Sequence, residues 1–170
     1  MDKGLVHLYC GRGKGKTTAA MGLALRALGR GRTVTVVQFL KNGTSGELEP
    51  LRSLGVNVLT GPKDTAFVSK MTPEQGWENR RWNDQMLEEA MESPCDLLIL
   101  DELCAARKHD MVGVSLAKKA VLDRPGDREV VITGRDPEDW MLSAADYITE
   151  MECRRHPYEA GVPAREGIEY

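Results

Sequence analysis

Apolar runs of strand length alternate along the chain with amphipathic stretches, which predicts a β/α protein. The runs at 34–40 and 97–100 are nearly continuous in apolarity and rich in Val, Ile and Leu. Such runs are typical of strands that are covered on both faces. The predicted strands are residues 5–9, 34–40, 56–59, 97–100, 130–133 and 146–151.

Helical periodicity fills the intervals between these strands. Met21, Ala24 and Leu28 recur at helical spacing after the first strand. A longer helix is predicted to begin at Pro73, with Thr72 as its N-cap. We expect one face of that helix in the core, formed by Trp82, Met86 and Ala90. The other predicted helices are residues 18–28, 47–54, about 112–122 and 137–144.

Strands that alternate with helices at this spacing form βαβ units with right-handed crossovers. We therefore predict an α/β fold of three layers, in which helices cover both faces of a mainly parallel sheet. The 170 residues suit one domain spanning 1–170, and segment 156–170 is expected to be an irregular tail. Ligands of such sheets bind at the carboxyl ends of the strands.

A glycine-rich segment between the first strand and the first helix has the composition of a phosphate-binding loop. It reads Cys-Gly-Arg-Gly-Lys-Gly-Lys-Thr-Thr at positions 10–18. Glycines let successive N–H groups turn toward an anion, and the helix N-terminus adds partial positive charge. Cys10 stands where the usual pattern has its first glycine, so the loop is a variant, and we expect this cysteine to fill the strand end. The predicted ATP contacts in the loop are Gly11, Arg12, Gly13, Lys14, Gly15, Lys16, Thr17 and Thr18.

Polar residues also follow three other predicted strands. Asp101 and Glu102 follow the strand at 97–100 and are candidates to hold Mg²⁺ opposite the hydroxyl of Thr17. The sequence leaves open which carboxylate touches the metal. Lys41 is a further predicted ATP contact, and Arg135 either neutralises phosphate charge or forms a surface ion pair with a neighbouring acid.

Composition narrows the classes of partner. The net charge is −3, and the basic residues are scattered rather than gathered in a stripe, so no nucleic-acid surface is indicated. The apolar runs are far shorter than the roughly 20 residues of a spanning helix, and residues 1–4 begin no signal peptide. The four cysteines lack the paired spacing of a zinc site or a disulfide framework. We therefore expect a cytoplasmic protein that does not enter a membrane.

The three histidines lie in no recognisable triad or metal spacing. A chain that binds magnesium triphosphate without an evident acid, base or nucleophile suits a reaction whose nucleophile arrives with the second substrate.

Five segments carry a resemblance to a known family. They are residues 11–18, Val-Val-Gln-Phe-Leu-Lys at 36–41, Leu-Asp-Glu-Leu at 100–103, Val-Ile-Thr-Gly-Arg at 131–135, and Ala-Gly-Val-Pro-Ala-Arg-Glu-Gly-Ile-Glu-Tyr at 160–170. Together they resemble the P-loop ATP:corrinoid adenosyltransferases. The resemblance spans nearly the whole chain and implies a P-loop NTPase fold of the RecA-like kind.

The resemblance implies an activity and its partners. The family moves the 5′-deoxyadenosyl group of ATP to the cobalt of a reduced cob(I) corrinoid and releases triphosphate, in cobalamin biosynthesis or salvage. Mg²⁺, a homodimer, an electron donor such as a flavoprotein, and an ATP held in the opposite sense to most P-loop enzymes are also implied. Because negative charge grows on the leaving triphosphate, Lys16 and Thr17 are the catalytic candidates.

Contacts to the corrinoid are also implied by the resemblance. Phe67 takes a place comparable to an aromatic residue that the family uses above the corrinoid. Two residues on, Ser69 stands where well-known members have tryptophan, and Trp77 is the next candidate.

Two other functions are open at this point. An ordinary P-loop ATPase or kinase would use Glu102 to orient water or an acceptor and would release ADP. A non-catalytic relative would bind nucleotide or corrinoid without a reaction.

Overall fold

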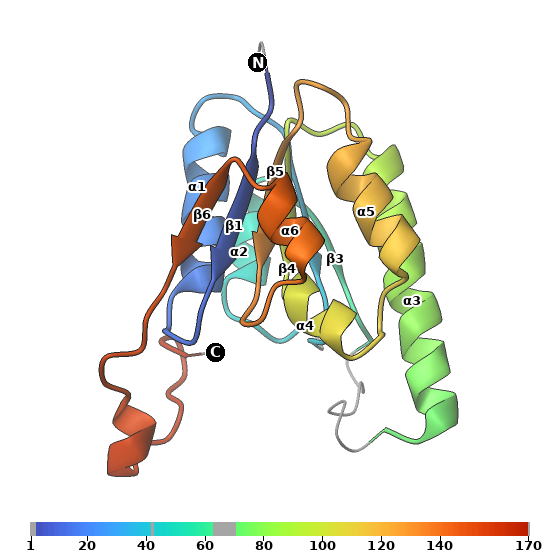
Figure 1. Cartoon of the computed structure of the whole chain (residues 1–170). Coiled ribbons are helices and arrows are strands. Elements are labelled where there is room, and N and C mark those ends of the chain that lie inside the picture. Colours follow the sequence, from blue (N-terminus) through green and yellow to red (C-terminus); the bar gives the residue numbers. More distant parts are fainter. Residues whose placement is uncertain (1–2, 42, 63–70, 170) are drawn as a thin grey trace.

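The computed structural model describes residues 3–41, 43–62 and 71–169, and its centre is a six-stranded sheet with helices on both faces (Figure 1). The strand order is β3-β2-β4-β5-β1-β6, and the described strands pair in parallel throughout. The predicted mainly parallel sheet is confirmed. The strands are β1 (Val6–Cys10), β2 (Val34–Gln38), β3 (Asn57–Thr60), β4 (Leu97–Asp101), β5 (Glu129–Thr133) and β6 (Tyr147–Glu150).

The helices connect successive strands. A 3-10 helix, η2 (Pro157–Ala160), lies in the C-terminal segment beyond β6. The α-helices are α1 (Lys16–Leu28), α2 (Leu48–Ser53), α3 (Pro73–Glu92), α4 (Leu103–Lys108), α5 (Val114–Leu122) and α6 (Asp139–Ala144). Among the described residues, none of these helices is long and apolar enough to cross a membrane.

Two hydrophobic clusters lie on opposite faces of the sheet. Helices α1 and α2 cover one face, and helices α3, α4, α5 and α6 cover the other. Successive residues of β4 point to opposite faces: Leu97 and Ile99 belong to the first cluster, whereas Leu98 and Leu100 belong to the second. The prediction that this strand is covered on both faces is confirmed, because each of its residues is buried.

The predicted elements agree with the structure, with small shifts at their ends. Helix α1 begins at Lys16, two residues before the predicted start, because Gly15 adopts a left-handed conformation (φ 115°) at its N-cap. Thr72 caps α3 as predicted: its Oγ1 accepts from Gln75 N at 3.3 Å, and its own N–H donates to Gln75 Oε1 at 2.9 Å. Helix α4 was not predicted, since six residues give too short a pattern to show a period.

One core prediction is wrong. Met86 and Ala90 are buried, as expected, but Trp82 is 44% exposed. Its indole N–H points to the carbonyl oxygen of Thr60 at 3.4 Å, at the end of the edge strand β3. Trp82 therefore lies beside the end of an edge strand and outside the hydrophobic core.

Candidate functional site

The phosphate-binding loop follows β1 and curls against the end of the neighbouring strand β6. Gly11 has a left-handed φ of 97°, which disfavours a residue with a side chain. The N–H of Gly13 donates to the carbonyl oxygen of Met151 at 2.6 Å. A Cβ on Gly13 would lie 2.7 Å from that same oxygen, which is too close for any side chain. A Cβ on Gly11 would lie 2.6 Å from the same oxygen, so the backbone of residue 151 requires glycine at both positions.

Lys16 occupies the first position of α1 and is buried, with 9% of its surface exposed. Its ammonium Nζ donates to the carbonyl oxygen of Gly13 at 2.7 Å, so the side chain folds back over the loop. Burial lowers the pKa of Lys16, and the nearby carboxylate of Glu102 opposes that shift. The ammonium therefore lies directly against the backbone of the phosphate-binding loop.

Asp101 is the most connected side chain of the site and is fully buried. Its Oδ1 accepts from the hydroxyl of Thr17 at 2.9 Å and from the hydroxyl of Thr133 at 2.7 Å. Its Oδ2 accepts from Nζ of Lys41 at 3.0 Å and from Nε2 of Gln38 at 3.2 Å. Four elements of the fold therefore meet at one carboxylate, directly beside the phosphate-binding loop.

Glu102 lies one residue beyond the strand and differs from Asp101 in its backbone. Its φ of 63° is left-handed, which is uncommon for a residue with a long side chain. Its N–H donates to the hydroxyl of Thr133 at 2.9 Å, so this threonine braces both acidic residues. Burial and then the charge of Asp101 raise the pKa of Glu102. A raised carboxyl pKa beside a phosphate loop is a common feature of functional sites.

Lys41 and Arg135 reach the same edge of the sheet but differ in their partners. Lys41 is paired with Asp101, as described above. Arg135 is exposed and has no hydrogen bond or ion pair from its side chain within the described residues. The adjacent Asp136 pairs with Lys108 at 2.6 Å instead. The pKa of the Asp136 carboxyl is lowered by Lys108 and, to a smaller extent, by the charge of Arg135, so both roles predicted for Arg135 stay predictions.

The other predicted loop residues take two kinds of position. Arg12, Lys14 and Thr18 are exposed. Cys10 is buried, and burial raises the pKa of its thiol, which fits the expected packing role at the end of β1.

Comparison with known proteins shows which family this chain belongs to. A family model described as ATP:corrinoid adenosyltransferase BtuR/CobO/CobP matches residues 2–170. The chain belongs to this family. The corrinoid adenosyltransferase of Escherichia coli strain K12 is 34% identical over 181 aligned residues, which cover 99% of this chain and 87% of that protein.

Solved structures agree on the fold of this corrinoid adenosyltransferase family member. The flagellar accessory protein FlaH from Methanocaldococcus jannaschii superimposes with a TM-score of 0.53 at 15% identity, over 88% of this chain and 72% of that chain. The RadB recombinase superimposes with a TM-score of 0.52 at 14% identity, over 92% of this chain and 78% of that one. The predicted RecA-like P-loop NTPase fold is confirmed by these likenesses.

The residues expected to contact the corrinoid are only partly described. Phe67 and Ser69 lie outside the described residues. Trp77 is 72% exposed in the first turns of α3, whose N-terminal end lies at the same end of the sheet as the phosphate-binding loop (Figure 1). The position of this tryptophan leaves it open to a large apolar ligand.

The acidic residues fit a magnesium ion that is shared with a nucleotide. Within the described ranges, no group of three or more His, Cys, Asp or Glu side chains is placed to hold a metal unaided. Mg²⁺ is usually bound through one or two carboxylates together with phosphate oxygens and water, and does not need such a cage. The contact between Thr17 and Asp101 supplies the hydroxyl and the carboxylate that this type of site requires.

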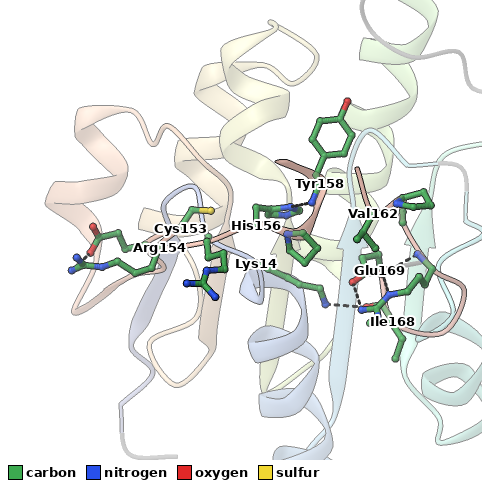
Figure 2. Close-up of a pocket in the computed structure, with 15 residues that line it drawn as sticks. Lys14, Cys153, Arg154, His156, Tyr158, Val162, Ile168 and Glu169 are labelled. Atoms are coloured by element: carbon green, nitrogen blue, oxygen red, sulfur yellow. Dashed lines mark hydrogen bonds and ion pairs between the residues drawn. The ribbon is translucent and has the colours of Figure 1, made fainter. Parts of the chain in front are cut away.

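Sequence reasoning missed the part of the site that the C-terminal segment builds. Residues 152–169 fold back beside the loop, and the Lys14 ammonium donates to the carbonyl oxygen of Ile168 at 2.9 Å (Figure 2). Segment 156–170 was expected to be an irregular tail, and η2 is its only regular element in the part described. The only signal in the sequence was the number of Arg, His and Tyr residues after β6. These residues follow no helical or strand period, so the pattern predicted no regular structure there.

Proposed function

We propose that this protein transfers the 5′-deoxyadenosyl group of ATP to the cobalt of a reduced corrinoid and releases inorganic triphosphate. The observation that carries the proposal is the family match over residues 2–170. The loop between β1 and α1 supports the nucleotide part, because its glycines, its buried lysine and its threonine suit a bound phosphate chain.

The reaction is a single displacement at carbon. Cobalt(I) donates its electron pair to C5′ of ATP, a cobalt–carbon bond forms, and the bond between C5′ and its oxygen breaks. The electron pair of that bond leaves with the triphosphate, so the phosphate chain gains negative charge as the reaction proceeds. Groups that meet this charge more strongly in the transition state accelerate the step.

The residues of the chain have separate parts in this scheme. The Lys16 ammonium and the loop N–H groups bind the phosphates and take up the growing charge. Mg²⁺ would be held by Thr17 and Asp101, with Glu102 close by, and would neutralise part of the triphosphate charge. Lys41 holds Asp101 in place from the far side, and Arg135 adds a cation beside the loop.

Two aromatic residues are candidates for the acceptor side of the site. We propose Phe67 and Trp77 as contacts of the corrinoid, on the strength of the family resemblance and of the exposure of Trp77. Cobalt(II) must gain one electron to become the nucleophile, so an electron donor such as a flavoprotein is a partner. The family resemblance also supports a homodimer, a cytoplasmic location and residues 1–170 acting as one domain.

The phosphorus product tests this function against its alternatives. Phosphorus NMR of the protein with magnesium-ATP and a chemically reduced corrinoid should show inorganic triphosphate, with one adenosylated corrinoid for each triphosphate. A P-loop ATPase or kinase would leave ADP instead, and a non-catalytic relative would leave ATP intact. Formation of ADP at a rate that does not depend on the corrinoid would refute the adenosyl transfer.

A further inference from the structure

Three fully buried polar residues form a row at the carboxyl ends of neighbouring strands. Gln38, Asp101 and Thr133 end β2, β4 and β5, which are adjacent in the sheet, and Gln38 lies opposite Asp101 in the register. The residues two positions before them belong to the hydrophobic cluster under α1 and α2: Val36, Ile99 and Val131. Since side chains two residues apart in a strand point to the same face, the row points to the face that α1 covers.

The amide of Gln38 is held between two carboxylates. Its Nε2 donates to Asp101 Oδ2 at 3.2 Å and to Glu47 Oε1 at 3.3 Å, and these two bonds use both hydrogens of the NH₂ group. The opposite orientation of the amide would bring its oxygen against two acceptors that have no hydrogen to donate. The network therefore fixes which atom of the amide is the oxygen.

That oxygen, Gln38 Oε1, has an unmet requirement for a donor. It is buried and has no hydrogen-bond partner among the residues that the structure describes. The other two members of the row are satisfied: Asp101 accepts four hydrogen bonds, and Thr133 donates to Asp101 and accepts from the N–H of Glu102. A buried acceptor without a partner is costly, and in native proteins it commonly marks a bound ion or an ordered water.

The neighbours of Gln38 Oε1 indicate which donor fits it. The ammonium of Lys41 is the nearby cation, and it already donates to Asp101 Oδ2 at 3.0 Å. A free water needs roughly two to four polar partners, and those in the row already bond to one another. A water bound to Mg²⁺ needs an acceptor, because Mg²⁺ keeps several of its waters in proteins and makes them stronger donors. The oxygen belongs to the amide that contacts Asp101, which the hydroxyl of Thr17 also contacts.

We propose that Gln38 is a positioning residue for the Mg²⁺ ion of the nucleotide site, and that its buried Oε1 accepts a hydrogen bond from a water bound to that ion. The inference rests on the magnesium ion of the proposed function. It gives Gln38 a role separate from that of Asp101: the carboxylate supplies negative charge, whereas the amide oxygen orients one water of the ion.

The gain in ATP affinity that magnesium produces tests this role without corrinoid or turnover. Calorimetric titrations give the Kd of ATP in EDTA and at saturating Mg²⁺, and the ratio of these two constants is termed the magnesium factor. Gln38→Met keeps the length of the side chain and removes the acceptor. It should lower the magnesium factor about fivefold, which corresponds to about 1 kcal/mol, the net contribution of one hydrogen bond. The Kd in EDTA should change by less than about twofold.

Gln38→Glu separates the acceptor from the contact with Asp101. Both variants lose the N–H donor to Asp101, but the glutamate keeps an oxygen at the end of the side chain, and a carboxylate accepts more strongly than an amide. Its magnesium factor should therefore equal or exceed that of the wild type. A factor below half the wild-type value would overturn the proposal by itself, whether or not Gln38→Met folds, because it would mean that Gln38 only holds Asp101 in place.

Glu47→Gln is the matched control. It removes a charge next to the Gln38 amide but keeps an oxygen that can accept from Nε2, so Oε1 stays in position. Its magnesium factor should differ from that of the wild type by less than about twofold. A loss equal to that of Gln38→Met would mean that only the field of the carboxylates acts on the ion, and would overturn the proposal.

The wild-type protein separates failure of this inference from failure of the proposed function. A wild-type magnesium factor near one would refute the magnesium site, and this inference with it. A large wild-type factor that Gln38→Met leaves unchanged would overturn the inference alone. Adenosyl transfer enters neither measurement, so the phosphorus product still decides it independently.

Discussion

Replacing Asp101 with asparagine keeps the shape of the side chain and removes its charge at the point where four hydrogen bonds meet. The ammonium of Lys41 can only donate, so the asparagine oxygen must turn toward it. The asparagine NH₂ group then faces the hydroxyls of Thr17 and Thr133, which must accept instead of donating. The packing is therefore kept, and the substitution removes one buried negative charge.

The expected cost of Asp101→Asn follows from this geometry. Breaking a buried ion pair costs about 3–5 kcal/mol, and a hydrogen bond to a charged group contributes about 1.5–3 kcal/mol. We expect about 2 kcal/mol, near the lower values, because the shape is kept and the Lys41 side chain is 29% exposed and can reach water. That cost lowers the melting temperature by about 4–8 °C for a chain of this size.

Urea unfolding and the magnesium dependence of triphosphate formation measure the two consequences. The variant should be less stable and should need more Mg²⁺, since a proposed metal ligand has lost its charge. Asp96→Asn is the control: Asp96 precedes the same strand at its other end and accepts from Thr33 and Arg32. It should leave the magnesium dependence unchanged. An Asp101→Asn protein with wild-type stability and magnesium dependence would refute the central role of this carboxylate.

Two further substitutions test the loop and the second acid. Gly13→Ala should lower the free energy of unfolding by about 1–3 kcal/mol, because its Cβ would meet the Met151 oxygen at 2.7 Å; Gly22→Ala, where a Cβ would meet nothing within 4 Å, should raise it by about 0.5–1 kcal/mol. Urea unfolding compares the two, and equal effects would contradict the close approach. Glu102→Gln should be more stable than the wild type at neutral pH, because a raised carboxyl pKa means that the ionised form is disfavoured in the folded state. The difference in the free energy of unfolding between the variant and the wild type should vanish below the ordinary carboxyl pKa of 4.5 and grow as the pH rises toward the raised value. Urea unfolding between about pH 4 and 8 measures this difference, and a difference that shrinks with rising pH would contradict the reasoning.

The parts of the fold that the sequence predicted are those with local causes. Strand β4 could be predicted because a strand that is buried between two helical layers needs a continuous apolar run. All five of its residues are buried in the structure. The start of α3 was predicted because Thr72 and Gln75 cap each other within one turn. The position of Trp82 was predicted wrongly, because exposure depends on where the sheet ends rather than on helical spacing.

The arrangement of the site could be predicted only in part, since its decisive contacts are distant in sequence. The pattern placed Asp101 and Glu102 together and left their roles open. The difference between them comes from Thr133, one strand away, which donates to the first acid and accepts from the N–H of the second. No pattern within the segment 97–103 contains that information. The contact between Lys14 and Ile168 spans most of the chain and has no local signature either.

The loop owes its shape in part to contacts with neighbouring residues of the chain. Met151 holds Gly13 through one backbone hydrogen bond, and Lys16 lies against the carbonyl oxygen of the same glycine. These two contacts fix the backbone of the loop, and a loop fixed in this way loses less conformational entropy when it binds a ligand. The same preorganisation serves the transition state, since donors already in place need no rearrangement as charge moves onto the triphosphate. Met151 directly follows β6, a strand that is at the edge of the sheet and exposed along its length. Changes that weaken its pairing with β1 should consequently reduce phosphate binding without touching any residue of the loop.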